Sequence, residues 1–184
     1  MSVSPKVNRK QIHNREIKCT GYERQDGLWD IEGRITDTKT YSFDNEDRGI
    51  VTSGMPVHDM LVRITVDEDL LLHEAEAFTV SSPFNICPII ANSVEKLVGL
   101  KITTGWRKSV RAKLGGIAGC THITELLIGP LATTAYQTII PLKKHPRKNK
   151  NPSQKPVIIN TCHGWSSKGP IVKRIWPQYY EGKE

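Results

Sequence analysis

The chain has 184 residues, a formal net charge of +7, 38% apolar residues and 24% charged residues, a composition typical of globular domains. No apolar run approaches the roughly 20 residues of a membrane-spanning helix, and the first residues lack the apolar core of a signal peptide. We therefore expect a cytoplasmic protein with no membrane partner, whose four cysteines stay reduced.

The first half of the chain predicts strands. Residues 1–14 show no hydrophobic pattern and are expected to form a flexible N-terminal arm. Two alternating runs then flank Asp26-Gly27, a dipeptide that favours a tight hairpin. Two further runs, at 60–66 and 70–80, also alternate between apolar and polar residues. The pattern predicts an antiparallel sheet of about three main strands with a preceding hairpin.

The second half predicts helices. Apolar residues recur at helical spacing over about 88–98, 103–114 and 121–139, and Gly129-Pro130 is expected to kink or break the last helix. Strands followed by helices indicate an α+β domain over residues 15–142, with the helices packed on one face of the sheet.

The last part of the chain is basic. Residues 143–155 mix lysine and arginine with proline and asparagine, which is typical of a solvated basic loop. Residues 156–184 are expected to be a C-terminal arm packed on the domain, with a short extended segment at 156–163. The positive charge leaves a nucleic-acid-binding module as an alternative, although no helix-turn-helix, zinc-finger or aromatic RNA-binding signature accompanies it.

Candidate metal ligands stand where loops meet strands or helices. His58 precedes a predicted strand, and Cys87 and Cys120 each precede a predicted helix. Imidazole and thiolate ligands of this kind suit zinc or iron, and His122 is a further candidate. Because a helix N-terminus lowers the pKa of a thiol, Cys120 is also a candidate nucleophile, although the metal-ligand interpretation comes first. Packing or capping explains the same residues without any metal.

Three side chains are candidates for proton transfer. Asp59 follows His58 directly, Glu125 lies one turn into the third predicted helix, and His163 follows Cys162. Each has a structural alternative: a loop carboxylate for Asp59, a helix cap for Glu125 and a packing role for the last pair. Adjacent residues of an extended chain face opposite sides, so only one of Cys162 and His163 could reach a site.

Four short motifs carry a resemblance that covers most of the chain. The segments D-G-L-W-D-I-E-G, P-V-H-D-M, G-C-T-H-I-T-E-L and T-C-H begin at residues 26, 56, 119 and 161. In this order they look like a bacterial domain family of unknown function. The resemblance implies no particular activity.

A second, remote resemblance concerns the metal candidates. The segment Gly54–Asp59, followed by strands, Cys87 and Cys120, resembles the iron–sulfur scaffold proteins of the NifU N-terminal type. Cys87 and Cys120 match the second and third metal-binding cysteines of that family, and His58 stands in place of the first. Met60 stands where the scaffold has an aspartate. The resemblance implies a similar fold and a metal, and the imidazole favours zinc over an iron–sulfur cluster.

The sequence thus favours a zinc-dependent enzyme that acts on a small molecule, a lyase or hydrolase of bacterial catabolism. Its expected ligands are His58, Cys87 and Cys120, with His122 or a water completing the shell, and nearby acids or imidazoles move protons. The alternative from another class is a non-enzymatic carrier or scaffold for sulfur or an iron–sulfur cluster.

Overall fold

The computed structural model describes residues 7–142, 155–156 and 158–182. The chain divides into two compact units, Met1–Lys143 and Lys144–Glu184, and each is described by itself. None of the described helices is long and apolar enough to cross a membrane.

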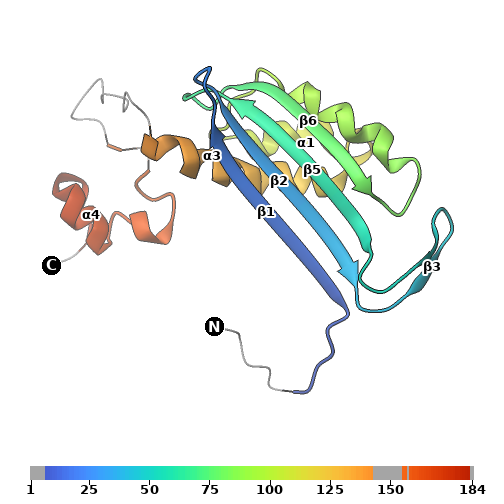
Figure 1. Cartoon of the computed structure of the whole chain (residues 1–184). Helices are drawn as coiled ribbons and strands as arrows, with labels where there is room; N and C mark the ends of the chain where they lie inside the picture. The colour runs from blue at the N-terminus through green and yellow to red at the C-terminus, as the bar shows by residue number, and fades with distance from the viewer. Residues whose placement is uncertain (1–6, 143–154, 157, 183–184) are drawn as a thin grey trace. The chain divides into compact units, whose positions relative to one another are not determined.

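The first unit is built on a four-stranded antiparallel sheet in the order β1-β2-β5-β6 (Figure 1). Its strands are β1 (His13–Glu23), β2 (Trp29–Lys39), β5 (Pro56–Val66) and β6 (Leu72–Ser81). The predicted hairpin at Asp26-Gly27 is confirmed, and Gly27 takes a φ of 84° that glycine accommodates most easily.

The predicted strand arrangement needs a correction. β2 pairs with β5 along most of its length, so the hairpin strands belong to the main sheet instead of preceding it. β1 begins at His13, so His13 and Asn14, the last two residues of the predicted N-terminal arm, belong to the sheet. Two short strands, β3 (Phe43–Asn45) and β4 (Gly49–Val51), form a separate small hairpin between β2 and β5.

A shift in register explains the uneven alternation of β6. The pairing of β5 with β6 shifts between Thr65 and Val66, where one residue of β6 is skipped. Leu72 and Ala75 are therefore both buried although they are three residues apart. A β-bulge of this kind changes which side chains face the core.

Helices cover one face of the sheet (Figure 1), and the predicted α+β class is confirmed. In order they are a 3₁₀ helix η1 (Cys87–Leu97), α1 (Trp106–Leu114), η2 (Gly116–Ala118), α2 (Thr121–Leu126), a π-helical turn η3 (Leu127–Leu131), α3 (Ala132–Ile139) and η4 (Ile140–Leu142). Helical backbone runs without interruption from α2 to η4, and Pro130 lies inside the π turn. Because proline has no backbone N–H, the wider turn takes the place of the predicted kink or break.

Gly33 lets this long helix approach the centre of the sheet. A Cβ atom at Gly33 would lie 3.0 Å from Leu131 Cδ2 and 3.2 Å from Leu126 Cδ1. The neighbouring residues on the same face of β2, Ile31 and Ile35, are fully buried. The helix therefore packs most closely on the one residue of this row that has no side chain.

We expect Gly33→Val to lower the free energy of unfolding by about 1–3 kcal/mol, because the added methyl groups force Leu126 and Leu131 out of place. Urea unfolding measures this loss. The control is Glu32→Val, which adds an apolar side chain at the adjacent, exposed position of β2 and should change stability by less than about 0.5 kcal/mol. Equal losses in both variants would contradict the close-approach explanation.

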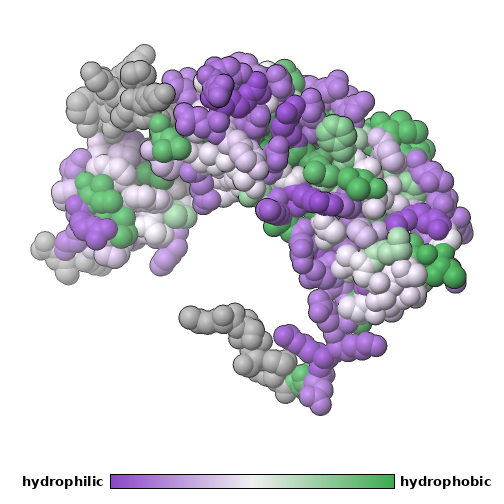
Figure 2. Space-filling view, viewed as in Figure 1, coloured by the Kyte–Doolittle hydropathy of each residue, from purple (hydrophilic) through white to green (hydrophobic). Residues whose placement is uncertain are grey.

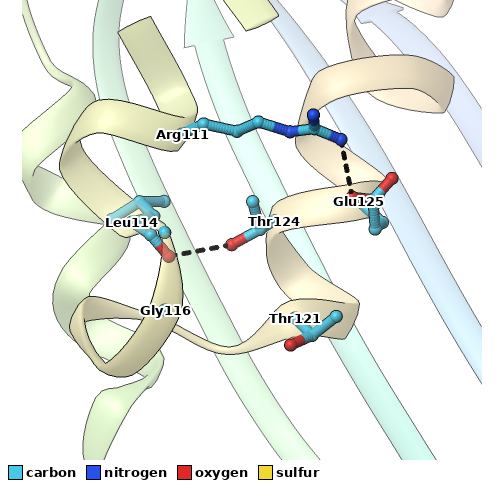
Figure 3. Close-up of a pocket in the computed structure, with 7 residues that line it drawn as sticks. Arg111, Leu114, Gly116, Thr121, Thr124 and Glu125 are labelled. Carbon is cyan, nitrogen blue, oxygen red and sulfur yellow. Dashed lines mark hydrogen bonds and ion pairs between the residues drawn. The ribbon is translucent and has the colours of Figure 1, made fainter. Parts of the chain in front are cut away.

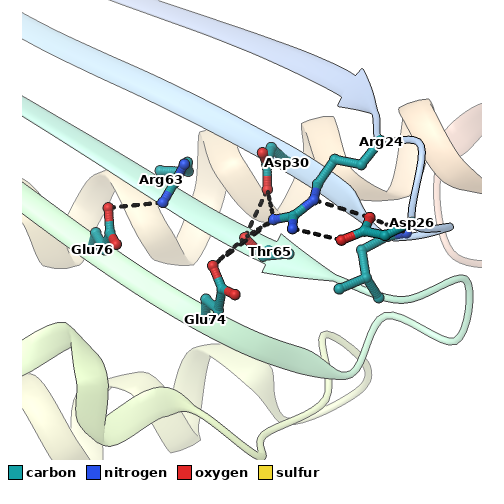
Figure 4. Close-up of polar contacts among 8 residues, drawn as sticks. Arg24, Asp26, Asp30, Arg63, Thr65, Glu74 and Glu76 are labelled. Carbon is teal, nitrogen blue, oxygen red and sulfur yellow. Dashed lines mark hydrogen bonds and ion pairs between the residues drawn. The ribbon is translucent and has the colours of Figure 1, made fainter.

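The opposite face of the sheet is largely polar, with a few exposed apolar side chains such as Phe78. Figure 2 shows hydrophilic side chains over much of this face, and Figure 4 shows their contacts. Arg63 Nη2 donates to Glu76 at 3.0 Å, and Thr65 Oγ1 donates to Asp30 at 2.7 Å. A solvated second face is usual for an antiparallel sheet.

The second unit contains η5 (His163–Trp165), α4 (Pro170–Ile175) and η6 (Pro177–Tyr179). The extended segment predicted at 156–163 is not found in the described residues of that range. Asn160 has a φ of 65°, and its N–H donates to the Trp165 carbonyl, which closes a turn. Most of the predicted basic loop, residues 143–154, lies outside the described residues. That residues 156–184 pack on the domain stays a prediction.

Candidate metal centre

A buried carboxylate lies at the end of the core-facing row of β2. Asp37 continues the alternation of Trp29, Ile31, Gly33 and Ile35 and is 1% exposed. Since a buried charge requires partners, the cross-strand neighbours of Asp37 decide what this position can do. They are Arg15 on β1 and His58 on β5.

Arg15 holds Asp37 in a bidentate ion pair. Arg15 Nε donates to Oδ1 and Nη2 donates to Oδ2, both at 2.7 Å, and His13 Nε2 lies 3.2 Å from Oδ1. Burial raises the pKa of Asp37, but the hydrogen bond and charge of Arg15, with smaller contributions from His58 and His122, hold it below its ordinary value. The carboxylate is therefore ionised at neutral pH.

Two imidazoles reach the same carboxylate from different elements. His58 Nδ1, on β5, lies 3.2 Å from Asp37 Oδ2. His122 Nε2, in the first turn of α2, lies 3.6 Å from the same oxygen. The centroids of the two rings lie 3.8 Å apart, and the ring planes are tilted by 32° to each other. Two strands and a helix thus bring three possible ligands together.

Both imidazoles favour their neutral form. Burial lowers the pKa of His58, and this outweighs the opposing effect of Asp37. Burial also lowers the pKa of His122, with further lowering by the charges of His58 and Arg15. Neutral imidazole is the form that binds metal ions, so the site presents an anionic oxygen and two neutral nitrogens.

The spacing of these atoms fits a small divalent cation. One oxygen of Asp37, one nitrogen of His58 and one nitrogen of His122 all lie within 4.8 Å of one another. Bonds of about 2.0–2.1 Å in a tetrahedral arrangement put ligand atoms about 3.3 Å apart. The separations of 3.2 Å and 3.6 Å are close to that value. Three protein ligands would leave a fourth position open.

The two cysteines predicted as ligands are not members of this group. Cys120 Sγ lies 3.9 Å from His122 Nδ1, the ring nitrogen that does not face Asp37. Cys120 is therefore placed to orient the His122 ring through the nitrogen that faces away from Asp37. Such a contact commonly fixes the orientation and the basicity of a histidine that binds a metal. Cys87 is the first residue of η1 and is half-buried. Asp37 offers the carboxylate oxygen that completes the group in their stead.

Asp59 does not accompany His58. Successive residues of a strand face opposite sides, and Asp59 lies on the open face of the sheet, where Arg34 Nε donates to its Oδ1 at 2.7 Å. Asp59 is 2% exposed and is held by this ion pair. The predicted role of Asp59 as a proton carrier or partner of His58 is therefore not supported by its position.

Glu125 and His163 also lie elsewhere. Figure 3 shows a pocket between α1 and α2, lined by Arg111, Leu114, Gly115, Gly116, Thr121, Thr124 and Glu125. In it Arg111 Nη2 donates to the exposed Glu125 at 3.3 Å, and no residue of the Asp37 group lines it. His163 belongs to the second unit, in η5.

Three residues of the centre do not appear among the sequence-based candidates: His13, Arg15 and Asp37. The available signal was the alternation of β2, which places Asp37 on the core-facing side if it is continued by two residues. Pairing outward from the Asp26-Gly27 turn then sets Arg15 opposite Asp37. A carboxylate paired with a guanidinium at a position that faces the core indicates a functional site more directly than either charged residue does alone.

Comparison with known proteins identifies a family. Residues 13–137 match the family described as "Protein of unknown function (DUF2889)". The match includes every residue of the centre. No curated protein and no solved structure matches the chain.

Proposed function

We propose that this chain, which belongs to the DUF2889 family of proteins of unknown function, is a zinc-dependent enzyme that acts on a small molecule. Asp37, His58 and His122 would hold the metal. The observation that carries the proposal is the convergence of their ligand atoms within 4.8 Å, from two strands and a helix.

The ligand set favours a catalytic over a purely structural zinc. Structural sites have four protein ligands, most of them cysteines, whereas catalytic sites have three protein ligands and an open position. A metal bound there supplies Lewis-acid activation of a substrate oxygen or of water, which suits a hydrolase or lyase. Arg15 fixes the carboxylate, and the half-exposed His13 beside Asp37 Oδ1 is placed to exchange protons with solvent.

Metal analysis of the purified full-length protein tests the proposal. We expect about one zinc per chain. We also expect His58→Ala and His122→Ala each to reduce the bound zinc to less than about a tenth, because each removes one of three protein ligands. The control is His73→Ala, which removes an exposed imidazole that pairs with Asp67 outside the centre. The proposal is wrong if the purified protein holds no stoichiometric zinc or iron, or if His73→Ala loses as much zinc as the two ligand variants.

A second candidate is thiol chemistry at Cys120. Its Sγ lies 3.9 Å from His122 Nδ1, and the other nitrogen of that ring lies 3.6 Å from Asp37 Oδ2. This order of thiol, imidazole and carboxylate is that of an activated cysteine nucleophile. Faster alkylation of Cys120 than of the exposed Cys162 in metal-free protein, lost in His122→Ala, would favour this candidate over the zinc enzyme.

A further inference from the structure

Half of β1 is left open on the helix-covered side of the sheet. The residues of β1 on that side are His13, Arg15, Ile17, Cys19, Gly21 and Glu23, the partners of the core-facing side of β2. α3 covers Cys19 and Gly21: Thr134 contacts Cys19, and a side chain at Gly21 would overlap Thr138. Ile17, in contrast, is 46% exposed, and the side chain of Arg15 is 44% exposed. Arg15 and Ile17 therefore form an exposed surface, which we call the shelf, directly beside the candidate metal centre.

The shelf has a cationic end. Arg15 uses Nε and Nη2 for Asp37, and its Nη1 donates to no group in the part of the chain that the structure describes. The charges of Arg15 and Asp37 cancel, and an imidazole that binds a metal through a ring nitrogen adds no charge, so a divalent metal would make the centre net positive. A positive centre beside a guanidinium with unused N–H groups complements an anion, and carboxylates match the arginine fork well.

The other end of the shelf is apolar. Ile17 is the next residue on the same face of β1, about 7 Å along the strand from Arg15. A large apolar side chain exposed beside a polar centre offers surface for the apolar part of a ligand. The distance between Arg15 and Ile17 along the strand matches a small ligand in which a short linker joins a carboxylate to a ring or a branched alkyl group.

We infer that the centre binds small monocarboxylates that carry an aryl or branched alkyl group. The carboxylate lies at Arg15 Nη1 and the metal, and the apolar group lies against Ile17. This inference rests on the proposed function, since it places the ligand at the metal of the same centre.

Binding of three probes to the zinc-loaded full-length chain tests the ligand class by titration calorimetry. 3-Phenylpropanoate carries both features, propanoate lacks the ring, and 3-phenylpropanol lacks the charge. We expect 3-phenylpropanoate to bind at least about tenfold more tightly than either of the others. We expect Ile17→Ser to remove most of its advantage over propanoate without changing the zinc content.

Phe78→Ser is the matched control, because Phe78 is a large exposed apolar residue on β6 that lines a pocket on the open face of the sheet. It should leave binding of all three probes unchanged. The proposed ligand class is wrong if zinc-loaded protein binds the alcohol as tightly as the carboxylate, or if Ile17→Ser binds 3-phenylpropanoate like the wild type. Neither result would contradict the metal centre itself. Protein that takes up no zinc overturns both the ligand class and the metal centre.

Discussion

Asp37→Asn is expected to lower the zinc affinity at least about 100-fold. The amide keeps the shape of the side chain but loses the charge that makes a carboxylate a good ligand. The same change removes the anionic partner of Arg15. Breaking a fully buried ion pair costs about 3–5 kcal/mol, but Arg15 is partly exposed and can turn to water. We therefore expect a smaller loss of unfolding free energy in the metal-free protein, about 2 kcal/mol.

A second buried ion pair supplies the control for this prediction. Asp59 is as buried as Asp37 and pairs with an arginine, Arg34, on the opposite face of the same sheet. Asp59→Asn should therefore cost similar stability and leave zinc binding unchanged. Competition with a chromophoric chelator measures the affinity, and urea unfolding of the metal-free protein measures stability. If Asp59→Asn weakened zinc binding as much as Asp37→Asn, Asp37 would not be a ligand.

Trp106→Ala should lower the free energy of unfolding by about 3–5 kcal/mol, the usual cost of emptying a large aromatic site in a core. Trp106 is 5% exposed on α1, and its indole Nε1 donates to the Leu127 carbonyl at 3.0 Å. That carbonyl belongs to the first residue of the π turn. Trp106→Phe keeps most of the volume but leaves the buried carbonyl without this donor, so we expect a loss of about 1–3 kcal/mol.

The two variants separate packing from hydrogen bonding at the π turn. Thermal or urea unfolding followed by circular dichroism avoids the change in tryptophan fluorescence. Trp29→Phe is the comparison, since Trp29 is 6% exposed and its indole has no hydrogen-bond partner within the described residues. A loss in Trp106→Phe no larger than in Trp29→Phe would show that the bond to Leu127 contributes little.

The fold followed from the sequence where local patterns are strong. The Asp26-Gly27 turn, the alternation of β2 and the apolar spacing of α1 and α2 each predict the element that forms. The missed features depend on distant contacts. The bulge in β6 is set by its pairing with β5, and the turn at Asn160 depends on bonds to Trp165 and Ser167.

The sequence predicts two members of the candidate metal centre. His58 and His122 were candidates, and the structure brings both to one carboxylate. The sequence pattern puts His58 on a loop, whereas β5 begins at Pro56, and the period of two along the strand turns the side chain of Asp59 away from that of His58. Asp37 lies in a polar stretch, Thr36 to Lys39, whose strand character comes from its neighbours β1 and β5.

The order of the three candidate ligands along the chain governs when the proposed metal centre could form during synthesis. Asp37 and His58 lie on neighbouring strands, but His122 comes only with the helix that closes over the sheet. Domains are made from the N-terminus onward, so a nascent chain that ends before residue 122 lacks one of the candidate ligands. Metal capture would therefore be one of the last events in maturation of this unit, and a bound ion would then hold the helix to the sheet by mass action.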